Sequence, residues 1–326
     1  MKHMYTKLLT FTLLVTITSI IFTKKDNKEE KMKTFYKDLS VLVTGGAGFI
    51  GSHITQKLVK LGAKVTVIDN LSTGNIQNLE NVKNDIRFIE KNIVDMDACL
   101  EATKGQAVIF HLAAFISVPE SIKNPSKCHK INVDGTFNML DAARTHGVQR
   151  FVFSSSSAVY GVVEGVCKET MTPHPESPYG TSKLIGEYYC KQFANNFGLH
   201  TIALRYFNVF GERQNPNGAY AAVVAKFKDL MKQNKPLTIF GDGLQTRDFI
   251  PVSDVVEANL TVAMLPPESM NGQVFNVATG KSINLLELID MLKNNFPAYD
   301  QDILFKPARA GDIKHSSADC SKYKCI

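Results

Sequence analysis

The sequence predicts an α/β protein built on a doubly wound parallel sheet, with a smaller C-terminal lobe. Two observations lead to this fold class. Short apolar stretches alternate with helical stretches of about 10 to 15 residues, which is typical of a parallel sheet covered by helices on both faces. In addition, the first apolar stretch runs directly into a glycine-rich loop at 45–51, and a helical pattern follows the loop at once.

The apolar stretches are the predicted strands of the main sheet. The first covers residues 39–44 before the glycine loop, and the second covers 64–69 and ends in an acid. Both are runs of apolar and β-branched residues of strand length. Further strands are expected at 86–90, 107–112, 150–154 and 201–205, with helices between them that include 133–145 and 182–197.

The pattern changes after the last of these strands. A loop rich in Gly, Asn and Pro follows at 211–218, and then a helical stretch at 221–232. We therefore expect residues 34–205 to form a Rossmann-type dinucleotide-binding domain. Residues 206–326 are expected to form mainly a substrate-binding lobe, with about 249–276 returning to the Rossmann domain.

The first 33 residues are a separate segment with the composition of a leader. Lys2 and Lys7 precede an apolar run at 8–22, and a lysine-rich stretch follows. This order fits a signal peptide or a short membrane anchor, although ~15 residues are fewer than the ~20 of a spanning helix. If the segment inserts, its lysines keep the following domain in the cytoplasm. Alternatively, translation begins at Met32, and residues 1–31 are an extension with no role in catalysis.

Composition argues against several classes of function. The net charge of +6 and the isoelectric point near 8.8 come from basic residues scattered among acids, so we expect a small phosphorylated ligand and no nucleic acid. The six cysteines have no C-x-x-C spacing, which argues against a metal site and against a disulfide framework. A reducing compartment such as the cytoplasm is the expected location.

The glycine loop has the form of a pyrophosphate site. Gly45, Gly48 and Gly51 let backbone amides approach a phosphate, whose charge is then favoured by the N-terminus of the next helix. Asp69 ends the next strand 18 residues after Gly51, where a carboxylate bonds ribose hydroxyls and disfavours a 2'-phosphate. We therefore predict NAD, and not NADP, as the cofactor.

Tyr179 and Lys183 are candidates for acid-base chemistry. A spacing of four residues on a helix puts the phenol and the ammonium on one face, ~6 Å apart along the axis. A tyrosinate near neutrality needs its pKa lowered from ~10 by ~3 units, or ~4 kcal/mol. One cation at this distance supplies ~3 kcal/mol in an effective dielectric of ~20, and a positive nicotinamide ring supplies the remainder. Taken alone, such a pair is usually an ordinary surface pair.

Four serines, 154–157, end the predicted strand at 150–154 and continue beyond it. They fall at the edge where doubly wound sheets bind ligands, and a hydroxyl there can bond a substrate oxygen. The alternative is a serine-rich turn that caps the strand. The residues alone do not single out one serine.

Several segments together resemble the extended short-chain dehydrogenase/reductase family. They are Thr44–Gly51, His111–Ala114, the serine strand, Tyr179–Lys183 and Leu204–Gly211, and the resemblance covers about 39–322. Within that family the chain is most similar to UDP-glucose and UDP-N-acetylglucosamine 4-epimerases. The resemblance implies NAD-dependent 4-epimerisation of a UDP-hexose through a 4-keto intermediate.

The same resemblance implies roles for individual residues. Ser156 holds the sugar O4, Tyr179 is the base, and Lys183 binds the nicotinamide ribose and tunes the tyrosine. The other implied cofactor contacts are Gly45, Gly48, Phe49, Ile50, Gly51, Asp69, Asn70, Asn92, Ile93 and Ala113. The implied substrate contacts, besides Ser156 and Tyr179, are Ser117, Asn208, Arg247, Arg309, Asp312 and Ser316. We also expect a homodimer.

Ser316 leads to a prediction about the substrate range. By the resemblance it stands where epimerases restricted to UDP-glucose and UDP-galactose have a bulky tyrosine. Because the sugar turns over between hydride removal and return, the pocket must hold the C2 substituent in two orientations. We therefore expect UDP-N-acetylglucosamine and UDP-N-acetylgalactosamine to be accepted, as well as the plain hexoses. The stretch 215–223 also resembles that of acetamido-sugar epimerases.

Other activities of the family differ at the end of the serine strand. Sugar-nucleotide 4,6-dehydratases resemble one another in an Asp-Glu pair where this chain has Ser157 and Ala158. UDP-glucuronate decarboxylases usually keep a glutamate next to Val159, where this chain has Ala158. These two activities are the alternatives. A non-catalytic NAD-sensing protein is a further alternative, but it would have no need of Tyr179 and Lys183 together.

Overall fold

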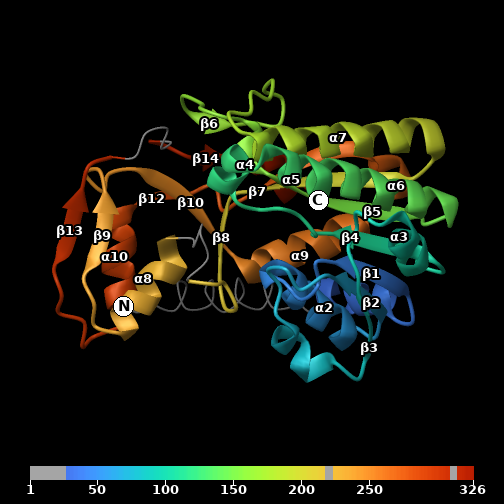
Figure 1. Ribbon diagram of the computed structural model, residues 1–326, viewed down its shortest axis with the longest axis horizontal. Helices are drawn as coiled ribbons and strands as arrows, with labels where there is room; N and C mark the ends of the chain where they lie inside the picture. The colour runs from blue at the N-terminus through green and yellow to red at the C-terminus, as the bar shows by residue number, and fades with distance from the viewer. Residues whose placement is uncertain (1–26, 217–222, 309–313) are drawn as a thin grey trace, which may run out of the picture.

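The centre of the molecule is a seven-stranded sheet in which every neighbouring pair of strands is parallel (Figure 1). The structure is a computed structural model that describes residues 27–216, 223–308 and 314–326. The strands across the sheet are β3 (Ile86–Glu90), β2 (Lys64–Asp69), β1 (Ser40–Thr44), β4 (Val108–His111), β5 (Arg150–Ser156), β7 (His200–Tyr206) and β11 (Asn271–Val277). This order confirms the predicted doubly wound α/β fold.

The strand order reverses next to β1. The chain runs outward from β1 to β2 and β3, and then crosses back to place β4 on the other side of β1. Ligands of doubly wound sheets bind outside the carboxyl ends of the strands at such a reversal. The glycine loop follows β1, and the serines end β5 two strands away.

One predicted boundary in the main sheet was wrong in an informative way. The prediction ended a strand at residue 154, whereas β5 continues to Ser156 and pairs there with Tyr206 of β7. The backbone of a serine pairs as readily as that of any residue, so the change to polar side chains did not end the strand. The extra two residues carry Ser156 to the carboxyl edge of the sheet.

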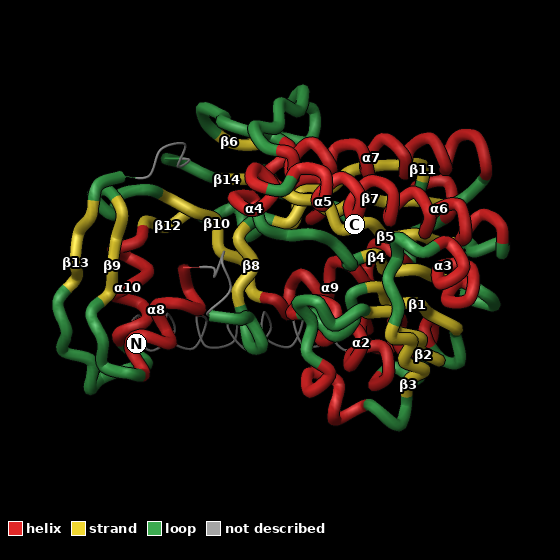
Figure 2. Tube along the Cα trace, in the orientation of Figure 1, coloured by secondary structure: helices red, strands yellow, loops and turns green. Residues whose placement is uncertain are grey.

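Helices cover both faces of the sheet (Figure 2). On one face, α2 (Phe49–Lys60) packs with α9 (Val252–Ala263), and on the other α6 (Gly135–Thr145) lies between α3 (Met96–Thr103) and α7 (Pro178–Phe197). Each layer closes over its own apolar core of buried side chains. Each large aliphatic or aromatic side chain buried there contributes roughly 1.5–3 kcal/mol to folding.

A second lobe lies beside one end of the sheet (Figures 1 and 2). It has its own apolar core and is built from short elements. They are β8 (Asn208–Phe210), α8 (Val223–Lys232), β9 (Leu237–Phe240), β10 (Thr246–Pro251), β12 (Ser282–Asn284), α10 (Leu285–Lys293) and β13 (Ile303–Lys306). Between β10 and β12 the chain returns to the main sheet through α9 and β11.

The remaining described elements are short. Near the carboxyl edge, β6 (Val166–Cys167) pairs with β14 (Ser317–Ala318). The short helices are Ile76–Val82, α4 (Val118–Lys123), α5 (Pro125–His129), a π-helical turn at Lys130–Asp134, Ser157–Val159, Pro267–Ser269 and α11 (Ser321–Lys324).

Residues 27–36 are helical and pack against the main domain. Met32 and Tyr36 are buried in the core under α9, and the Tyr36 hydroxyl donates to the carbonyl oxygen of Leu260 at 2.8 Å. This helix crosses the expected boundary at 33 and 34, so the folded part includes residues that we had assigned to the leader. Among the described residues, no helix is long and apolar enough to cross a membrane. The apolar run at 8–22 lies outside the described residues.

Candidate active site

The glycine loop forms a tight turn between β1 and α2, pressed against the loop that follows β4. Gly45 has a φ of 67°, and a Cβ there would lie 2.8 Å from the backbone nitrogen of Ala113. A Cβ on Gly51 would collide with the carbonyl oxygen of Gly45. Gly48 has an ordinary φ of −77°, so a glycine is not needed there for the backbone torsion. Its lack of a side chain instead leaves room for a ligand to approach the backbone.

The N-terminus of α2 is open to an anion. No side chain caps the helix at Gly48, and its first turn, which includes Phe49 and Ile50, contains no acidic residue. The first amides of a helix have no partner within the helix, and together with the helix dipole they favour a negative group. The donor set therefore fits the pyrophosphate of a dinucleotide.

Asp69 lies at the end of β2 with its carboxylate turned towards the glycine loop. Its Oδ2 accepts from the amide of Ala47 at 2.9 Å, and its Oδ1 accepts from the amide of Leu71 at 2.8 Å. Burial raises the pKa of Asp69, and these two hydrogen bonds oppose that rise. Each oxygen keeps a further lone pair, which fits a carboxylate that accepts from ribose hydroxyls.

The other candidate cofactor residues line the neighbouring strand ends. Ala113 donates its amide to the Thr44 hydroxyl at 3.0 Å, which holds the loop after β4 beside the glycine turn. Asn70 and Asn92 use their side chains locally, accepting from the amides of Ser72 and Val94. Ile93 is buried against Gly135.

The helix α7 brings Tyr179 and Lys183 to the carboxyl edge. The Ser177 hydroxyl accepts from the amide of Gly180 at 3.1 Å, and Pro178 opens the helix. This is a standard start signal, which places the helix start four residues earlier than the predicted 182. Tyr179 therefore lies in the first turn, and its amide donates to the Ser121 hydroxyl of α4 at 3.2 Å.

Lys183 is buried beneath Tyr179. Its ammonium lies 5.9 Å from the centroid of the Tyr179 ring, so the two side chains are neighbours on one face of the helix. It donates to the carbonyl oxygen of Ser154 at 2.8 Å and lies 5.1 Å from the Phe153 ring. Burial lowers the pKa of Lys183 to about 8, and the charge of Glu187 is among the influences that oppose this fall. The pair is therefore not an ordinary surface pair, since Lys183 is only 5% exposed.

Ser156 ends β5 and stays partly accessible. Its hydroxyl oxygen accepts from the amide of Ala158 at 3.1 Å, at the start of the short helix Ser157–Val159. Because the oxygen is the acceptor in that bond, the hydroxyl hydrogen remains available to donate to a ligand. Ser156, Tyr179 and Lys183 thus come from β5 and the facing end of α7, which pack against each other.

Two polar residues to which the sequence analysis gave no individual role support this arrangement. Asn132 lies in the π-helical turn, accepts from the amide of Phe115 at 2.6 Å, and donates to the Ser182 hydroxyl of α7 at 2.9 Å. His111 lies between Thr44 and Thr136, at 2.9 and 3.1 Å, and burial lowers its pKa to about 3, so it is neutral. No pattern of fixed spacing marks either residue.

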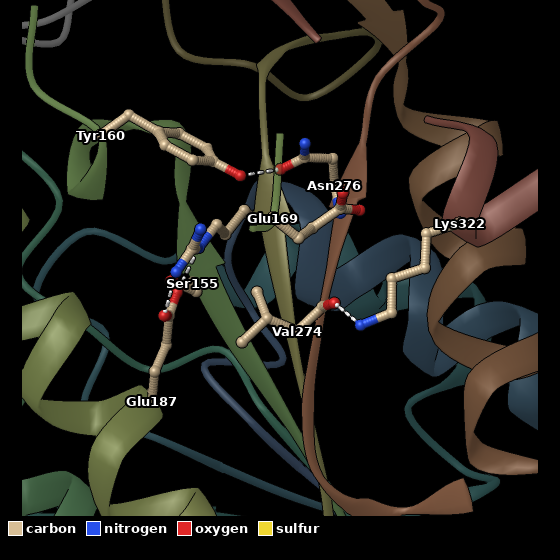
Figure 3. Close-up of polar contacts among 8 residues, drawn as sticks. Ser155, Tyr160, Glu169, Glu187, Val274, Asn276 and Lys322 are labelled. Atoms are coloured by element: carbon tan, nitrogen blue, oxygen red, sulfur yellow. Dashed lines mark hydrogen bonds and ion pairs between the residues drawn. The ribbon is translucent and has the colours of Figure 1, made fainter. Parts of the chain in front are cut away.

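A buried ion pair lies directly beneath the serine strand (Figure 3). Glu187 of α7 accepts from the Ser155 hydroxyl at 2.5 Å and binds Arg205 of β7 through both carboxylate oxygens, at 2.9 and 2.7 Å. Both side chains of the pair are 4% exposed. Glu187 comes one helical turn after Lys183 on α7. This spacing could have indicated from the sequence that Glu187 faces the site, but the sequence analysis did not use it.

The candidate substrate residues are spread around the junction of the two lobes. Asn208 of β8 donates to the carbonyl oxygen of Asp248 at 3.1 Å, and Arg247 of β10 donates to the carbonyl oxygen of Thr246 at 2.9 Å. The Ser316 amide donates to the carbonyl oxygen of Thr246 at 3.1 Å, so Ser316 lies beside β10. Ser117 caps α4. Arg309 and Asp312 lie outside the described residues.

Comparison with known proteins agrees with this geometry. Residues 41–278 match the model of the NAD dependent epimerase/dehydratase family. A putative UDP-glucose 4-epimerase from Methanocaldococcus jannaschii is 41% identical over 88% of this chain and 92% of its own length. A solved UDP-N-acetylglucosamine 4-epimerase from Methanobrevibacter ruminantium M1, in complex with UDP-N-acetylmuramic acid, superposes with a TM-score of 0.83 at 41% identity, covering 88% and 91%. A UDP-N-acetyl-alpha-D-glucosaminuronate decarboxylase from Bacillus cytotoxicus is 36% identical over 76% and 77%.

Proposed function

The chain belongs to the NAD dependent epimerase/dehydratase family, and on this premise we propose that it catalyses the 4-epimerisation of a UDP-hexose. The observation that carries the proposal is the buried ammonium of Lys183, held 5.9 Å from the ring of Tyr179 at the strand end that bears Ser156. The names of the similar proteins, UDP-glucose and UDP-N-acetylglucosamine 4-epimerase, support this choice of reaction.

The cofactor of this family is NAD, which when bound takes a hydride from the sugar and gives it back. In this chain the amides at the start of α2, reached through Gly45, Gly48 and Gly51, would hold the pyrophosphate. Asp69 would hold the adenosine ribose. Lys183 would hold the nicotinamide ribose.

The proton chemistry falls to Tyr179 and Ser156. Tyr179 as phenolate would take the proton of the sugar 4-hydroxyl, which leaves a 4-keto sugar once C4 has lost its hydride. Ser156 would donate a hydrogen bond to O4 and so keep the oxygen in place through both halves of the reaction. After the sugar has turned over, Tyr179 would return the proton to O4. The ammonium of Lys183 stabilises the phenolate throughout.

Decarboxylation is the second candidate activity, because one relative bears that name. Elimination or decarboxylation would gain from an acid at the strand end, but Ser157 and Ala158 form a short turn without one. The nearby carboxylate of Glu187 is held in a bidentate pair with Arg205. A neutral strand end favours a reaction that moves one proton and one hydride reversibly.

Incubation of the purified chain with UDP-glucose or UDP-N-acetylglucosamine, without added cofactor, tests the proposal. Chromatography should show each sugar approaching equilibrium with its 4-epimer, because the cofactor is regenerated within every cycle. Loss of carbon dioxide from UDP-glucuronate would instead support the decarboxylase. A dehydrated sugar, or net consumption of NADPH, would contradict the epimerase.

We propose that the substrate range includes the 2-acetamido sugars. Ser316 lies beside Thr246 of β10, and its carbonyl oxygen accepts from Ser282 at 2.7 Å, so its backbone is held at the edge of the lobe. A serine there leaves room for the C2 substituent. Ser316→Tyr should lower kcat/KM for the acetylated pair selectively, whereas equal losses on acetylated and plain sugars would show that Ser316 does not control this choice.

We also propose a homodimer formed through α6 and α7. On these adjacent helices the large side chains of Phe137 and Tyr188 are 40% and 57% exposed. A second copy that covers them would remove apolar surface from water, as symmetric dimers do. Light scattering should give the mass of a dimer for the wild type and a lower mass for Tyr188→Glu. A monomeric wild type would contradict this proposal.

The division of labour between the two parts of the chain remains our proposal. Residues 34–205, together with about 249–276, would bind NAD, and the rest of 206–326 would bind the UDP-sugar. Location in the cytoplasm, with or without an N-terminal anchor, also stays a prediction.

A further inference from the structure

Glu187 occupies a position that the reaction itself does not explain. It is a buried acid beneath the catalytic edge, yet it is fully engaged by two other residues. We propose that Glu187 is a positioning residue that fixes α7 against the sheet, and so sets where Tyr179 and Lys183 lie relative to Ser156. This inference rests on the proposed function for the roles of those three residues.

The first support is the placement of Glu187 on α7. It follows Lys183 by four residues and Tyr179 by eight, so the three side chains share one face of the helix. The neighbouring Gly186 has no room for a Cβ, which would collide with the ring of Phe153 of β5. The helix therefore approaches the strand closely at this turn, where a small shift would be transmitted to Tyr179.

The second support is the choice of partners on two strands. Successive side chains of a strand point to opposite faces, and Ser154 bonds Tyr206 at 3.1 Å while Ser155 bonds Glu187 of α7. Ser155 is thus the serine that faces the helix, between Ser154, whose carbonyl oxygen binds Lys183, and Ser156. The Glu187 carboxylate thus ties α7 to the strand that carries the catalytic hydroxyl, one helical turn beyond the tie made by Lys183.

The third support comes from Arg205, which also contacts the ring of Tyr160. Its guanidinium lies 4.6 Å from the centroid of the Tyr160 ring, and the Tyr160 hydroxyl donates to Asn276 of β11 at 2.6 Å. Asn276 in turn donates to the carbonyl oxygens of Cys167 and Asp319 at 3.0 and 3.1 Å, at the β6 and β14 pair. Glu187 is therefore linked through Arg205 and Tyr160 to β11 and to the β6 and β14 pair.

A positioning role also fits the chemistry of the pair. Both oxygens of the Glu187 carboxylate are taken up by two guanidinium bonds and one hydroxyl bond, so the side chain holds neighbouring elements together and is turned away from the role of a reacting group. Misplacement of a reacting group by about 1 Å can lower a rate by about 100-fold, even when the change is distant from the chemistry. The expected signature is a loss of kcat without a matching loss of substrate binding.

Two variants test the inference, so that one of them remains informative if the other does not fold. Ser155→Ala removes only the hydroxyl that joins β5 to Glu187 and keeps the ion pair. The double variant Glu187→Met, Arg205→Met replaces both charges with side chains of similar volume, which often leaves stability unchanged. For each, three quantities are measured: the Tm, the Kd for NAD without substrate, and kcat and KM for the UDP-sugar.

If Glu187 positions α7, Ser155→Ala should lower kcat about 10-fold while KM changes less than about 3-fold, because the base is displaced but the sugar contacts remain. The double variant should fold and lose about 10- to 100-fold in kcat, and its Kd for NAD should rise because Lys183 is displaced. Glu187→Asp, which keeps the charge but shortens the reach, should resemble the double variant and not the wild type.

Glu257→Gln is the matched control, since it breaks an exposed pair between α9 and Lys28 on the other face of the sheet and should change none of these values. A folded double variant with wild-type kcat and wild-type affinity for NAD would overturn the inference, as would a Ser155→Ala variant with wild-type kcat. If the double variant does not fold, Ser155→Ala decides. A wild type without epimerase activity would refute the proposed function. The positioning role would then be tested by comparing the Kd for NAD of each variant with that of the wild type.

Discussion

The carboxyl edge of the main sheet and the substrate lobe hold their candidate residues in different ways. At the sheet edge, Lys183 and Asp69 are 5% and 8% exposed, and both are bonded to the backbone of neighbouring segments. In the lobe, Asn208, Arg247 and Ser316 are partly exposed and lie on or beside short strands. The side chains at the sheet edge are thus held by buried hydrogen bonds, whereas those of the lobe are positioned by the pairing of short strands.

This difference suggests how the two regions divide the work. A reaction that removes and returns a hydride at one atom needs the base, the cofactor site and the hydroxyl at constant distances, and buried hydrogen bonds provide that. Substrate choice needs only a surface that can change at a few positions. We therefore expect substitutions at the sheet edge to lower kcat or the binding of NAD, and substitutions in the lobe to change KM and selectivity.

The largest expected effect is that of Tyr179→Phe. Without the phenol there is no group to take the proton of the 4-hydroxyl, so kcat should fall by about 100-fold or more. The binding of the UDP-sugar, measured by calorimetry, should stay largely intact because the ring remains. A variant with near-normal turnover would show that the sheet edge does not supply the base.

Gly51→Ala tests whether the glycine loop is as tightly packed as the structure indicates. A Cβ there meets the carbonyl oxygen of Gly45, so the loop must move. The free energy of unfolding should fall by about 1–3 kcal/mol, and the purified variant should contain less bound NAD. Gly105→Ala is a suitable control, because a Cβ there meets nothing within 4 Å and only its positive φ is strained. Unchanged NAD content in Gly51→Ala would contradict the assigned pyrophosphate site.

The pH dependence of stability offers a further test of the buried edge. Lys183 has a pKa of about 8 in the folded chain, against ~10.4 for an unperturbed lysine in the unfolded chain. Between these values the unfolded chain binds more protons, so the free energy of unfolding should rise with pH. Urea unfolding of Lys183→Met from pH 7.5 to 9.5 should lack this rise, and parallel curves for the two proteins would refute the burial of the charge.

The smallest expected effect is that of Arg247→Ala, in the lobe. Its guanidinium is a proposed contact of the UDP-sugar, so the variant should raise KM by about 10-fold, as for the loss of one charge-assisted hydrogen bond, with little change in kcat. Initial rates over a range of UDP-sugar concentrations measure both constants. A fall in kcat as large as the rise in KM would mean that the lobe takes part in the chemical step, which would contradict the proposed difference between the two regions.

The same division explains how much was predictable from the sequence. The central strands β1 and β2 are rich in apolar and β-branched residues because both of their faces are buried, and for this reason they were recognised at 39–44 and 64–69. The lobe's β8 and β12 have three residues each and are only partly buried, so they carry no periodic signal. Pairing with β10, more than thirty residues distant from each, creates them.

The candidate site shows the same limit. Tyr179, Lys183 and the glycines could be identified because their spacing is fixed by one turn or one helix. The partners Ser155, Glu187 and Arg205 lie on three elements, and only the folded sheet brings them within hydrogen-bond distance. The helix at 27–36 was not predicted for a related reason. Most of its residues are charged or polar, and the two side chains that it buries, Met32 and Tyr36, are too few to give a periodic apolar pattern.

The most direct test of the central claim follows the hydrogen at C4 of the sugar. The purified chain is incubated with UDP-glucose or UDP-N-acetylglucosamine in heavy water, and the product is analysed by nuclear magnetic resonance. Because the hydride is removed and returned within the closed site, the 4-epimer should keep protium at C4, with deuterium only on exchangeable oxygens and nitrogens. Deuterium at C4, or a product that has lost water or carbon dioxide, would contradict the account.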